Sequence, residues 1–394
     1  MLSRLKFDIS PIFEAIYNEV IPEWVFLSTE TTFADIQAAG LQSILPIINK
    51  LRYYGHSENN IRSRVFVFTE NEVYFNYVMA KYKNLPITIK VYNEKIKMKF
   101  DVVVGNPPYQ VSEEKRGING GSNKKLWMKF LYLSLDLLKQ NGFLAILVPN
   151  SWAAGAKNPH TKENIFQDII RKKNILQIQM DLSEYFNVGI GISSIVLQNT
   201  ERKSKTIKVE GTQIAIDNFD MLPKKINENL ISVLEKINTF PKLNFEFVRI
   251  EIKGDKLSSE FSNNYPYKVF LGKSGIKFTN KTTKYDNKPK ILIHRIGYGD
   301  GNLKTCLDAT GEITPSYSNV ILNDNIDELQ KIDKLLKTPF YNFLYNLFKY
   351  TQYNESRALS QLPNINLSSE INDGEIFKVL NLTKDEIESI RILY

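Results

Sequence analysis

The tetrapeptide Asn106-Pro107-Pro108-Tyr109 is the part of the sequence best suited to chemistry, and it follows a run, Asp101–Gly105, that reads as a buried strand. Two consecutive prolines fix φ and lack N–H groups, so the carbonyl groups of Asn106 and Pro107 stay out of any strand ladder. The Asn106 side-chain oxygen and a backbone carbonyl can then accept both hydrogens of an exocyclic amine, which draws its nitrogen towards sp³ geometry. Tyr109 offers a flat face on which a nucleobase can stack.

A turn of this kind needs a sheet to position it, and the first half of the chain alternates short β-branched runs with helical patterns. Such alternation is typical of βαβ units on a parallel sheet. The predicted strands are Thr32–Asp35, Arg64–Phe68, Thr88–Tyr92, Asp101–Val104, Phe143–Pro149, Ile175–Asp181 and Ile192–Gln198. The predicted helices are Gln42–Tyr54, Asn71–Lys83 and Lys125–Lys139, the last ending in a C-cap at Gln140-Asn141-Gly142. Ligands bind at the carboxyl ends of strands in open α/β sheets, where the tetrapeptide lies.

The pattern changes near residue 205. A polar link, Glu201–Lys205, leads into a stretch rich in Lys, Asn, Tyr and Gly, with helical patterns at about 324–350 and 383–391. The sequence therefore predicts two domains. Residues 1–205 form an α/β domain with helices on both faces of its sheet, and residues 206–394 form a mixed α+β domain.

Composition excludes several classes of protein. No apolar run reaches the roughly 18 residues that span a bilayer, and the first ten residues lack the apolar region of a secretory signal. The single cysteine, Cys306, rules out an intramolecular disulfide and fits a reducing compartment. One cysteine and three scattered histidines do not build a usual zinc site. We therefore expect a cytoplasmic protein without a metal ion or a membrane partner.

Several motifs together resemble the amino-group methyltransferases of the N6-adenine DNA type, especially those of restriction–modification systems. Besides the tetrapeptide, the matching stretches are Leu126-Trp127, Asn141–Trp152 and Tyr185–Gly191 running into the next strand. The resemblance implies a Rossmann-like fold dependent on S-adenosyl-L-methionine and methylation at N6 of an adenine flipped out of double-stranded DNA. It assigns catalysis to Asn106, Pro107, Pro108 and Tyr109, and stacking of the flipped base to Tyr109 and Phe186. The motif order resembles the γ class, whose C-terminal part recognises the target sequence.

The same resemblance implies a glycine-rich turn after the first strand, an acidic residue after the second and a polar residue after the third. The family's first motif reads roughly Asp/Glu-Pro-x-x-Gly-x-Gly, whereas this chain has Asp35–Leu41 with one glycine and no proline. That departure predicts a cofactor affinity on the weak side for the family. Glu70 is the candidate for the ribose hydroxyls and Asn93 for the adenine of the cofactor. The predicted cofactor contacts are Asp35, Ala39, Gly40, Glu70, Asn93 and Asn106.

Basic residues are concentrated in one window. The net charge is +8, and residues 268–304 carry nine Lys or Arg against two Asp. Lysines at phosphates and polar side chains at base edges are what DNA binding requires, although a solvated lysine-rich surface has the same composition. The loop Ser112–Lys125, next to the tetrapeptide, suits a flap over the substrate. The predicted DNA contacts are Lys115, Arg116, Lys273, Lys277, Lys281, Lys284, Lys288, Lys290 and Arg295.

Two other classes of function remain open from the sequence. Another amino-methyltransferase would act on RNA, on a protein glutamine or on N4 of cytosine, although cytosine-N4 enzymes resemble a Ser-Pro-Pro-Tyr pattern instead. A non-catalytic DNA-binding or restriction-associated subunit would keep the fold without the activity, as the altered cofactor turn allows. A separate restriction endonuclease or specificity subunit is a further candidate partner.

Overall fold

The computed structural model describes residues 8–36, 41–69, 71–92, 98–109, 126–154, 164–186, 191–296, 302–350, 355–367 and 370–393. The chain divides into two compact units, Met1–Asp220 and Met221–Tyr394. The boundary lies later than the predicted position near residue 205, because the hairpin of β8 (Thr206–Val209) and β9 (Thr212–Ala215) extends the sheet of the first unit. Among the described residues, no helix combines the length and the apolar character that crossing a membrane requires.

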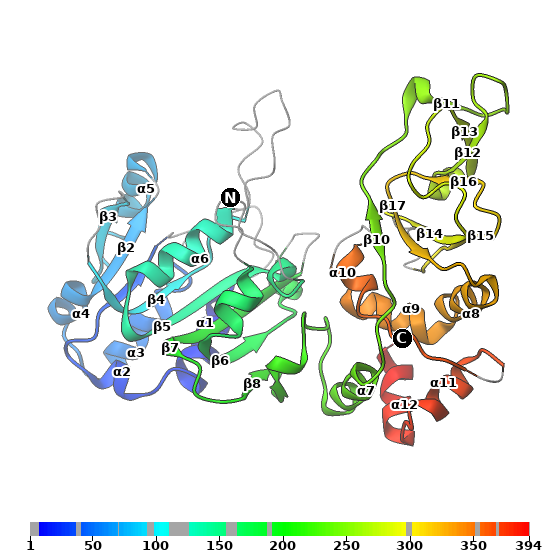
Figure 1. Cartoon of the computed structure of the whole chain (residues 1–394). Helices are drawn as coiled ribbons and strands as arrows, with labels where there is room; N and C mark the ends of the chain where they lie inside the picture. The colour runs from blue at the N-terminus through cyan, green and yellow to red at the C-terminus, as the bar shows by residue number, and fades with distance from the viewer. Residues whose placement is uncertain are drawn as a thin grey trace. The chain divides into compact units, whose positions relative to one another are not determined.

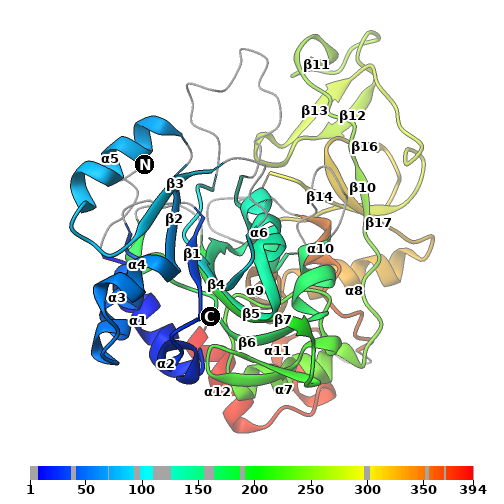
Figure 2. The same cartoon turned by 90° about the vertical axis from the view of Figure 1, so that its left-hand side faces the viewer.

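The first unit is built on one nine-stranded sheet in the order β3-β2-β1-β4-β5-β7-β6-β8-β9. Figure 2 shows the strands of this sheet side by side. The strands from β3 to β5 are parallel, and β7 runs antiparallel to both β5 and β6. The bounds of the first seven strands are β1 Phe33–Asp35, β2 Val65–Thr69, β3 Thr88–Val91, β4 Phe100–Gly105, β5 Leu138–Pro149, β6 Lys173–Gln179 and β7 Ile192–Glu201.

Helices cover both faces of this sheet, with α6 on one face and α1 and α3 on the other (Figure 1). Their apolar positions recur at helical spacing, so α3 buries Ile47, Ile48 and Leu51. Polar caps begin two of them, since the side chains of Ser57 and Asn71 accept from backbone N–H groups in the first turns of α4 and α5. The helices are α1 Ser10–Glu19, α2 Trp24–Leu27, α3 Leu45–Tyr53, α4 Glu58–Arg64, α5 Glu72–Tyr82 and α6 Leu126–Leu137.

The predicted end of the helix at Lys125–Lys139 is wrong. Helix α6 stops at Leu137, and Leu138 already belongs to β5, where it pairs with Phe100 of β4. The Gln140–Gly142 segment is therefore an irregularity within a strand and not a helix C-cap. Asn141 takes a positive φ of 62°, and a Cβ on Gly142 would lie 2.8 Å from the carbonyl oxygen of Asp101, so the bend requires glycine there.

The second unit contains two four-stranded sheets, ordered β10-β17-β14-β15 and β11-β13-β12-β16. A cluster of buried side chains from both sheets includes Val248, Phe270, Leu292 and Val320. The strands are β10 Glu246–Val248, β11 Leu257–Ser258, β12 Tyr267–Phe270, β13 Ile276–Thr279, β14 Lys290–His294, β15 Cys306–Asp308, β16 Ile313–Pro315 and β17 Ser318–Leu322. The helices are α7 Glu228–Asn238, α8 Ile326–Leu336, α9 Pro339–Phe348, α10 Ser356–Leu359, α11 Asp373–Val379 and α12 Lys384–Leu393.

The helical pattern at 324–350 is two helices, α8 and α9, instead of one. Thr338 separates them because its side chain accepts from the backbone N–H of Tyr341 and so caps α9, and Pro339 occupies the first turn. The pattern at 383–391 corresponds to α12.

Candidate active site

The tetrapeptide lies directly after β4, in the middle of the parallel part of the sheet. Strand β4 pairs with β1 on one side and β5 on the other, with Val104 opposite Asp35 and Gly105 opposite Ile146. The two neighbouring strands thus hold the turn at the carboxyl edge of the sheet. Pro107 and Pro108 are buried, whereas Asn106 is half-buried.

Two side chains of the tetrapeptide are bonded to each other. The Tyr109 hydroxyl donates a hydrogen bond of 2.8 Å to Oδ1 of Asn106. An amide side chain can rotate about its last torsion and exchange the positions of its oxygen and nitrogen. In the structure the Tyr109 hydroxyl donates to Oδ1 of Asn106, which keeps a second lone pair for another donor. The turn therefore contains an oriented acceptor.

The structure brings Phe186 against Tyr109. Their ring centroids lie 6.4 Å apart with the planes inclined at 53°, and the two residues are only 7% and 5% exposed. Phe186 follows a short turn at Ser183–Tyr185 and precedes β7, so it reaches the tetrapeptide from a distant part of the sequence. The two rings thus pack against each other in a tilted arrangement, next to the Asn106 amide to which Tyr109 is bonded.

A buried carboxylate lies next to the same edge. Asp35 ends β1, is 2% exposed, and accepts a hydrogen bond from the Ser43 hydroxyl. The Tyr17 hydroxyl donates to the backbone oxygen of Ser43 at 2.7 Å. Burial, with a smaller contribution from the Asp35 carboxylate, raises the pKa of Tyr17 well above its ordinary value, so the phenol stays a neutral donor.

Asp35 also lies close to the residue that precedes the tetrapeptide. A Cβ placed on Gly105 would stand 3.6 Å from Oδ1 of Asp35, so the carboxylate lies close to the residue that precedes Asn106. An acceptor of this kind suits the ammonium group of an amino-acid ligand. The donor–acceptor chemistry of the described residues therefore fits the amino-acid part of S-adenosyl-L-methionine. The other predicted cofactor residues, Ala39, Gly40, Glu70 and Asn93, lie outside the described residues.

Residues 29–186 match the Eco57I restriction-modification methylase family. This part of the chain is similar to the restriction–modification methylases of that family. The matched stretch begins before β1 and ends at Phe186, so it contains Asp35, the tetrapeptide and both aromatic rings.

Two curated proteins resemble the chain, each over a limited part. An uncharacterized adenine-specific methylase of Mycoplasma pneumoniae is 34% identical over 83 residues, which are 21% of this chain and 18% of that protein. A putative type II restriction enzyme and methyltransferase of Methanocaldococcus jannaschii is 24% identical over 215 residues, 52% of this chain and 17% of that protein. The chain thus spans less than a fifth of the length of either relative.

A solved structure supports the fold beyond the stretch that the family model matches. An ATP-dependent type ISP restriction-modification enzyme, LlaBIII, superposes with a TM-score of 0.51 at 9% identity, over 98% of this chain and 39% of that one. At this identity the match concerns the fold alone. With the topology of the sheet, it confirms the predicted fold class, a methyltransferase sheet followed by a mixed α+β unit.

Asn150 is a residue of the matched stretch that the sequence analysis did not single out. It follows β5 at the carboxyl edge and is 9% exposed, and its Nδ2 donates to the carbonyl oxygen of Met180 at 2.5 Å. Its Oδ1 is buried without a hydrogen-bond partner in the described part of the chain. Gly191 lies against it, because a Cβ there would stand 2.6 Å from Nδ2. The sequence did contain a signal for this residue. Asn150 directly follows a buried apolar run that ends at Pro149, just as Asn106 directly follows the run that ends at Gly105.

The predicted DNA contacts separate into four groups, of which Lys290 is the last. Lys115 and Arg116 lie outside the described residues, as does the side chain of Lys273. Lys277 is half-buried on β13, and Arg295 follows β14. The lysines that are exposed, as a phosphate contact requires, are Lys281, Lys284 and Lys288.

Lys290 was wrongly predicted to contact DNA. Its side chain is 0% exposed, and its Nζ lies 2.6 Å from Oδ2 of Asp308, which is itself 2% exposed. The two residues are directly opposite each other on β14 and β15. Asp308 also accepts from the backbone N–H groups of Glu312 and Ile313. Lys290 neutralises a buried carboxylate and cannot reach a phosphate.

Proposed function

We propose that this chain transfers a methyl group from S-adenosyl-L-methionine to N6 of an adenine flipped out of double-stranded DNA, as part of a restriction–modification system. One observation carries the proposal. The oriented amide of Asn106 stands at the carboxyl edge of a methylase sheet, beside the rings of Tyr109 and Phe186. An acceptor next to two aromatic faces matches the amine and the flat ring of adenine.

The proposed chemistry uses the acceptors of the turn. Oδ1 of Asn106 and a backbone carbonyl of the turn accept the two hydrogens of N6, which localises the nitrogen lone pair outside the plane of the base. Transfer would form a bond from N6 to the methyl carbon as the bond from that carbon to the sulfonium sulfur breaks, and the surplus proton on N6 would pass to water. Because the acceptors are already in place, little reorganisation accompanies the rise of positive charge on N6.

The cofactor supplies, when bound, a methyl group activated by a sulfonium centre. Asp35 is proposed to accept hydrogen bonds from the ammonium of its methionine part, since the carboxylate is buried at the end of β1 and lies beside Gly105. Asn106 and the residues Ala39, Gly40, Glu70 and Asn93 remain predicted contacts. Ser43 holds the carboxylate through its hydroxyl group.

The second unit is proposed to choose the DNA sequence. Lys281, Lys284 and Lys288 are exposed along the segment between β13 and β14, where lysines can contact phosphates. Such contacts determine position and affinity, whereas the choice of sequence needs side chains that reach base edges. A separate nuclease or specificity subunit remains a proposed partner.

The decisive experiment incubates the full chain with duplex DNA and radiolabelled S-adenosyl-L-methionine, and identifies the labelled nucleoside after digestion. We expect N6-methyladenine from the wild type and at least about 100-fold less from Asn106→Ala, which lacks a preorganised acceptor. Asn59→Ala, at an exposed position of α4, is the matched control and should retain activity. Label found in N4-methylcytosine, in RNA or in protein would show that the substrate is not adenine in DNA. DNA binding without any transfer would favour a non-catalytic subunit.

A further inference from the structure

Asn150 contacts the connection between β6 and β7 at both of its ends. The connection begins at Met180, directly after β6, and ends at Gly191, directly before β7. The backbone N–H of Asn150 donates to the carbonyl oxygen of Gly191 at 2.9 Å, and its side-chain Nδ2 donates to the carbonyl oxygen of Met180 at 2.5 Å. One residue, directly after β5, therefore fixes both ends of the connection.

The groups around this contact are themselves held in place. Asn150 begins a short helical turn that ends at Trp152, and the fully buried indole of Trp152 donates to the hydroxyl of Ser193 on β7 at 2.7 Å. The backbone N–H of Met180 donates to the carboxylate of Glu210, in the turn between β8 and β9. Side chains thus engage both the N–H and the carbonyl group of Met180, and Asn150 supplies the second of these bonds from an anchored position.

The connection carries Phe186. Six residues separate Phe186 from Met180 in the sequence, and a short turn at Ser183–Tyr185 lies between them. The last N–H of this turn donates to the carbonyl oxygen of Leu182 at 3.0 Å. Because the turn is closed in this way, a shift of the Met180 end would move the ring of Phe186 that packs against Tyr109.

Stability alone does not account for an amide at position 150. The residue is 9% exposed, and its Oδ1 is buried without a hydrogen-bond partner in the part of the chain that the structure describes. A buried acceptor of this kind lowers stability, and an apolar side chain of similar size would avoid that cost. What the amide adds is the Nδ2 donor to Met180.

We propose that Asn150 is a positioning residue of the reaction. By fixing the carbonyl group of Met180, it holds Phe186 against Tyr109, where the flipped base is to stack. This inference rests on the proposed function, since it takes a base at these two rings as the substrate.

The first test needs no DNA. Hydrogen–deuterium exchange of the full chain, measured by mass spectrometry, shows how readily the stretch Met180–Phe186 opens. Asn150→Ala removes the donor, so exchange in that stretch should become roughly 2- to 13-fold faster, as the loss of one hydrogen bond predicts. Gly191→Ala should have the same effect with Asn150 unchanged, because the added Cβ would stand 2.6 Å from Nδ2 and displace the amide. It provides a second variant should Asn150→Ala fold poorly.

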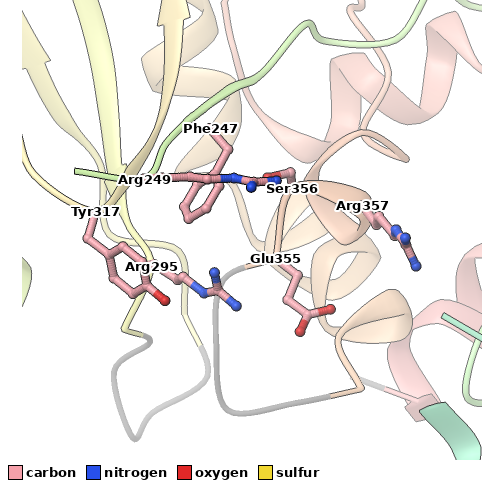
Figure 3. Close-up of a pocket in the computed structure, with 7 residues that line it drawn as sticks. All are labelled: Phe247, Arg249, Arg295, Tyr317, Glu355, Ser356 and Arg357. Atoms are coloured by element: carbon pink, nitrogen blue, oxygen red, sulfur yellow. The ribbon is translucent and has the colours of Figure 1, made fainter. Parts of the chain in front are cut away.

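Two control variants should leave this exchange unchanged. Asn199→Ala is the matched control, because Nδ2 of Asn199 on β7 also donates to a backbone carbonyl oxygen, that of Lys139 at the opposite end of β5, at 3.1 Å. Arg249→Ala is a control in the second unit, where the exposed Arg249 lines a pocket of about 440 Å³ (Figure 3).

The second test shows whether Asn150 acts through Phe186. With a 2-aminopurine at the target position and saturating protein, Asn150→Ala should lower base capture roughly 5-fold or more, up to the loss in Phe186→Ala. In the Phe186→Ala background it should have no further effect, because the ring that it positions is gone. Affinity for S-adenosyl-L-methionine should stay near that of the wild type, since β5 lies two strands away from β1 and Asp35.

Unchanged exchange in Met180–Phe186 with either Asn150→Ala or Gly191→Ala would overturn the inference. Additive losses of base capture in the double variant, or equal effects of a control variant, would overturn it too. Each of these results is compatible with methylation by the wild type, so the inference would fail alone. Faster exchange in the two variants, from a wild type that neither methylates DNA nor brightens 2-aminopurine, would sink the proposed activity and leave Asn150 as the residue that fixes Phe186.

Discussion

The hydroxyl of Tyr109 bonds to the side-chain oxygen of Asn106 at 2.8 Å. The aromatic residue of the turn therefore has two separate uses in the proposed reaction, since its ring can support the base and its hydroxyl orients the acceptor of the amine. From the sequence, we assigned Tyr109 to catalysis and to stacking of the base, but we gave its hydroxyl group no role. The hydrogen bond predicts that removing one oxygen atom will affect turnover without affecting base capture.

We expect Tyr109→Phe to reduce the single-turnover rate of methylation roughly 2- to 13-fold, which corresponds to about 0.5–1.5 kcal/mol for one hydrogen bond. DNA affinity should stay near that of the wild type because phosphate contacts dominate it. Rapid-quench measurements at saturating DNA and cofactor provide the rate, and a filter or anisotropy titration provides the affinity. A wild-type rate for Tyr109→Phe would show that the hydroxyl has no part in orienting Asn106.

Base capture should depend on Phe186. The centroids of Tyr109 and Phe186 are 6.4 Å apart at an angle of 53°, whereas a base between parallel rings needs roughly 7–8 Å, two contact distances. The rings must therefore realign as a base enters. A 2-aminopurine at the target position should brighten with the wild type and with Phe186→Tyr, but much less with Phe186→Ala, since one stacking contact is worth about 1–3 kcal/mol. Equal brightening with Phe186→Ala would show that Phe186 does not hold the flipped base.

Cofactor binding should depend on Asp35. Asp35→Asn keeps the shape of the side chain and its bond from Ser43, but it loses the charge that a bound ammonium would face. We expect S-adenosyl-L-methionine to raise the melting temperature of the wild type by mass action. The affinity of Asp35→Asn should fall about 10- to 150-fold, given about 1.5–3 kcal/mol for a hydrogen bond to a charged group. Calorimetry on both proteins measures the two dissociation constants, and equal values would show that Asp35 does not bind the ammonium group of the cofactor.

The two kinds of lysine near β14 should behave in opposite ways. Lys290 is fully buried against Asp308, so Lys290→Met should cost about 3–5 kcal/mol of stability by leaving an unpaired buried carboxylate. Lys281 is exposed, so Lys281→Ala should leave stability within about 0.5 kcal/mol and flatten the salt dependence of DNA binding. Denaturant unfolding and salt titrations of both variants test this pair. A stable Lys290→Met protein with weakened DNA binding would contradict the assignment.

Cys306 should be slow to react at neutral pH. Burial, assisted by the carboxylates of Asp308 and Asp333, raises the pKa of the Cys306 thiol to about 11. The thiolate is the nucleophile, so about one molecule in a thousand is reactive at pH 8. Alkylation by iodoacetamide should accelerate steadily as the pH rises towards 11, and Cys306→Ser should methylate DNA normally. Rapid alkylation at pH 7, or an enzyme–DNA adduct at Cys306, would refute this.

The first unit was largely predictable because its strands are continuous buried runs. Strand β4, with Val102 to Val104 buried on both sides, has the composition of a central parallel strand, and the two prolines after it fix the end. The second unit was not predictable in the same way. Its strands are two to five residues long, too short for an alternating pattern to emerge. Composition also cannot distinguish Lys290 from Lys288, because the difference lies in a partner on the neighbouring strand.

The hairpin of β8 and β9 has a practical consequence for dissecting the chain. It covers β6, with Val209 beside Ile178 and the backbone N–H of Glu210 donating to the carbonyl oxygen of Ile178. A fragment cut at residue 205, where the composition changes, would turn β6 into an unprotected edge strand with unpaired backbone groups and a bare apolar face. Such edges template aggregation. A fragment that continues to Asp220 keeps the hairpin and so keeps the edge closed.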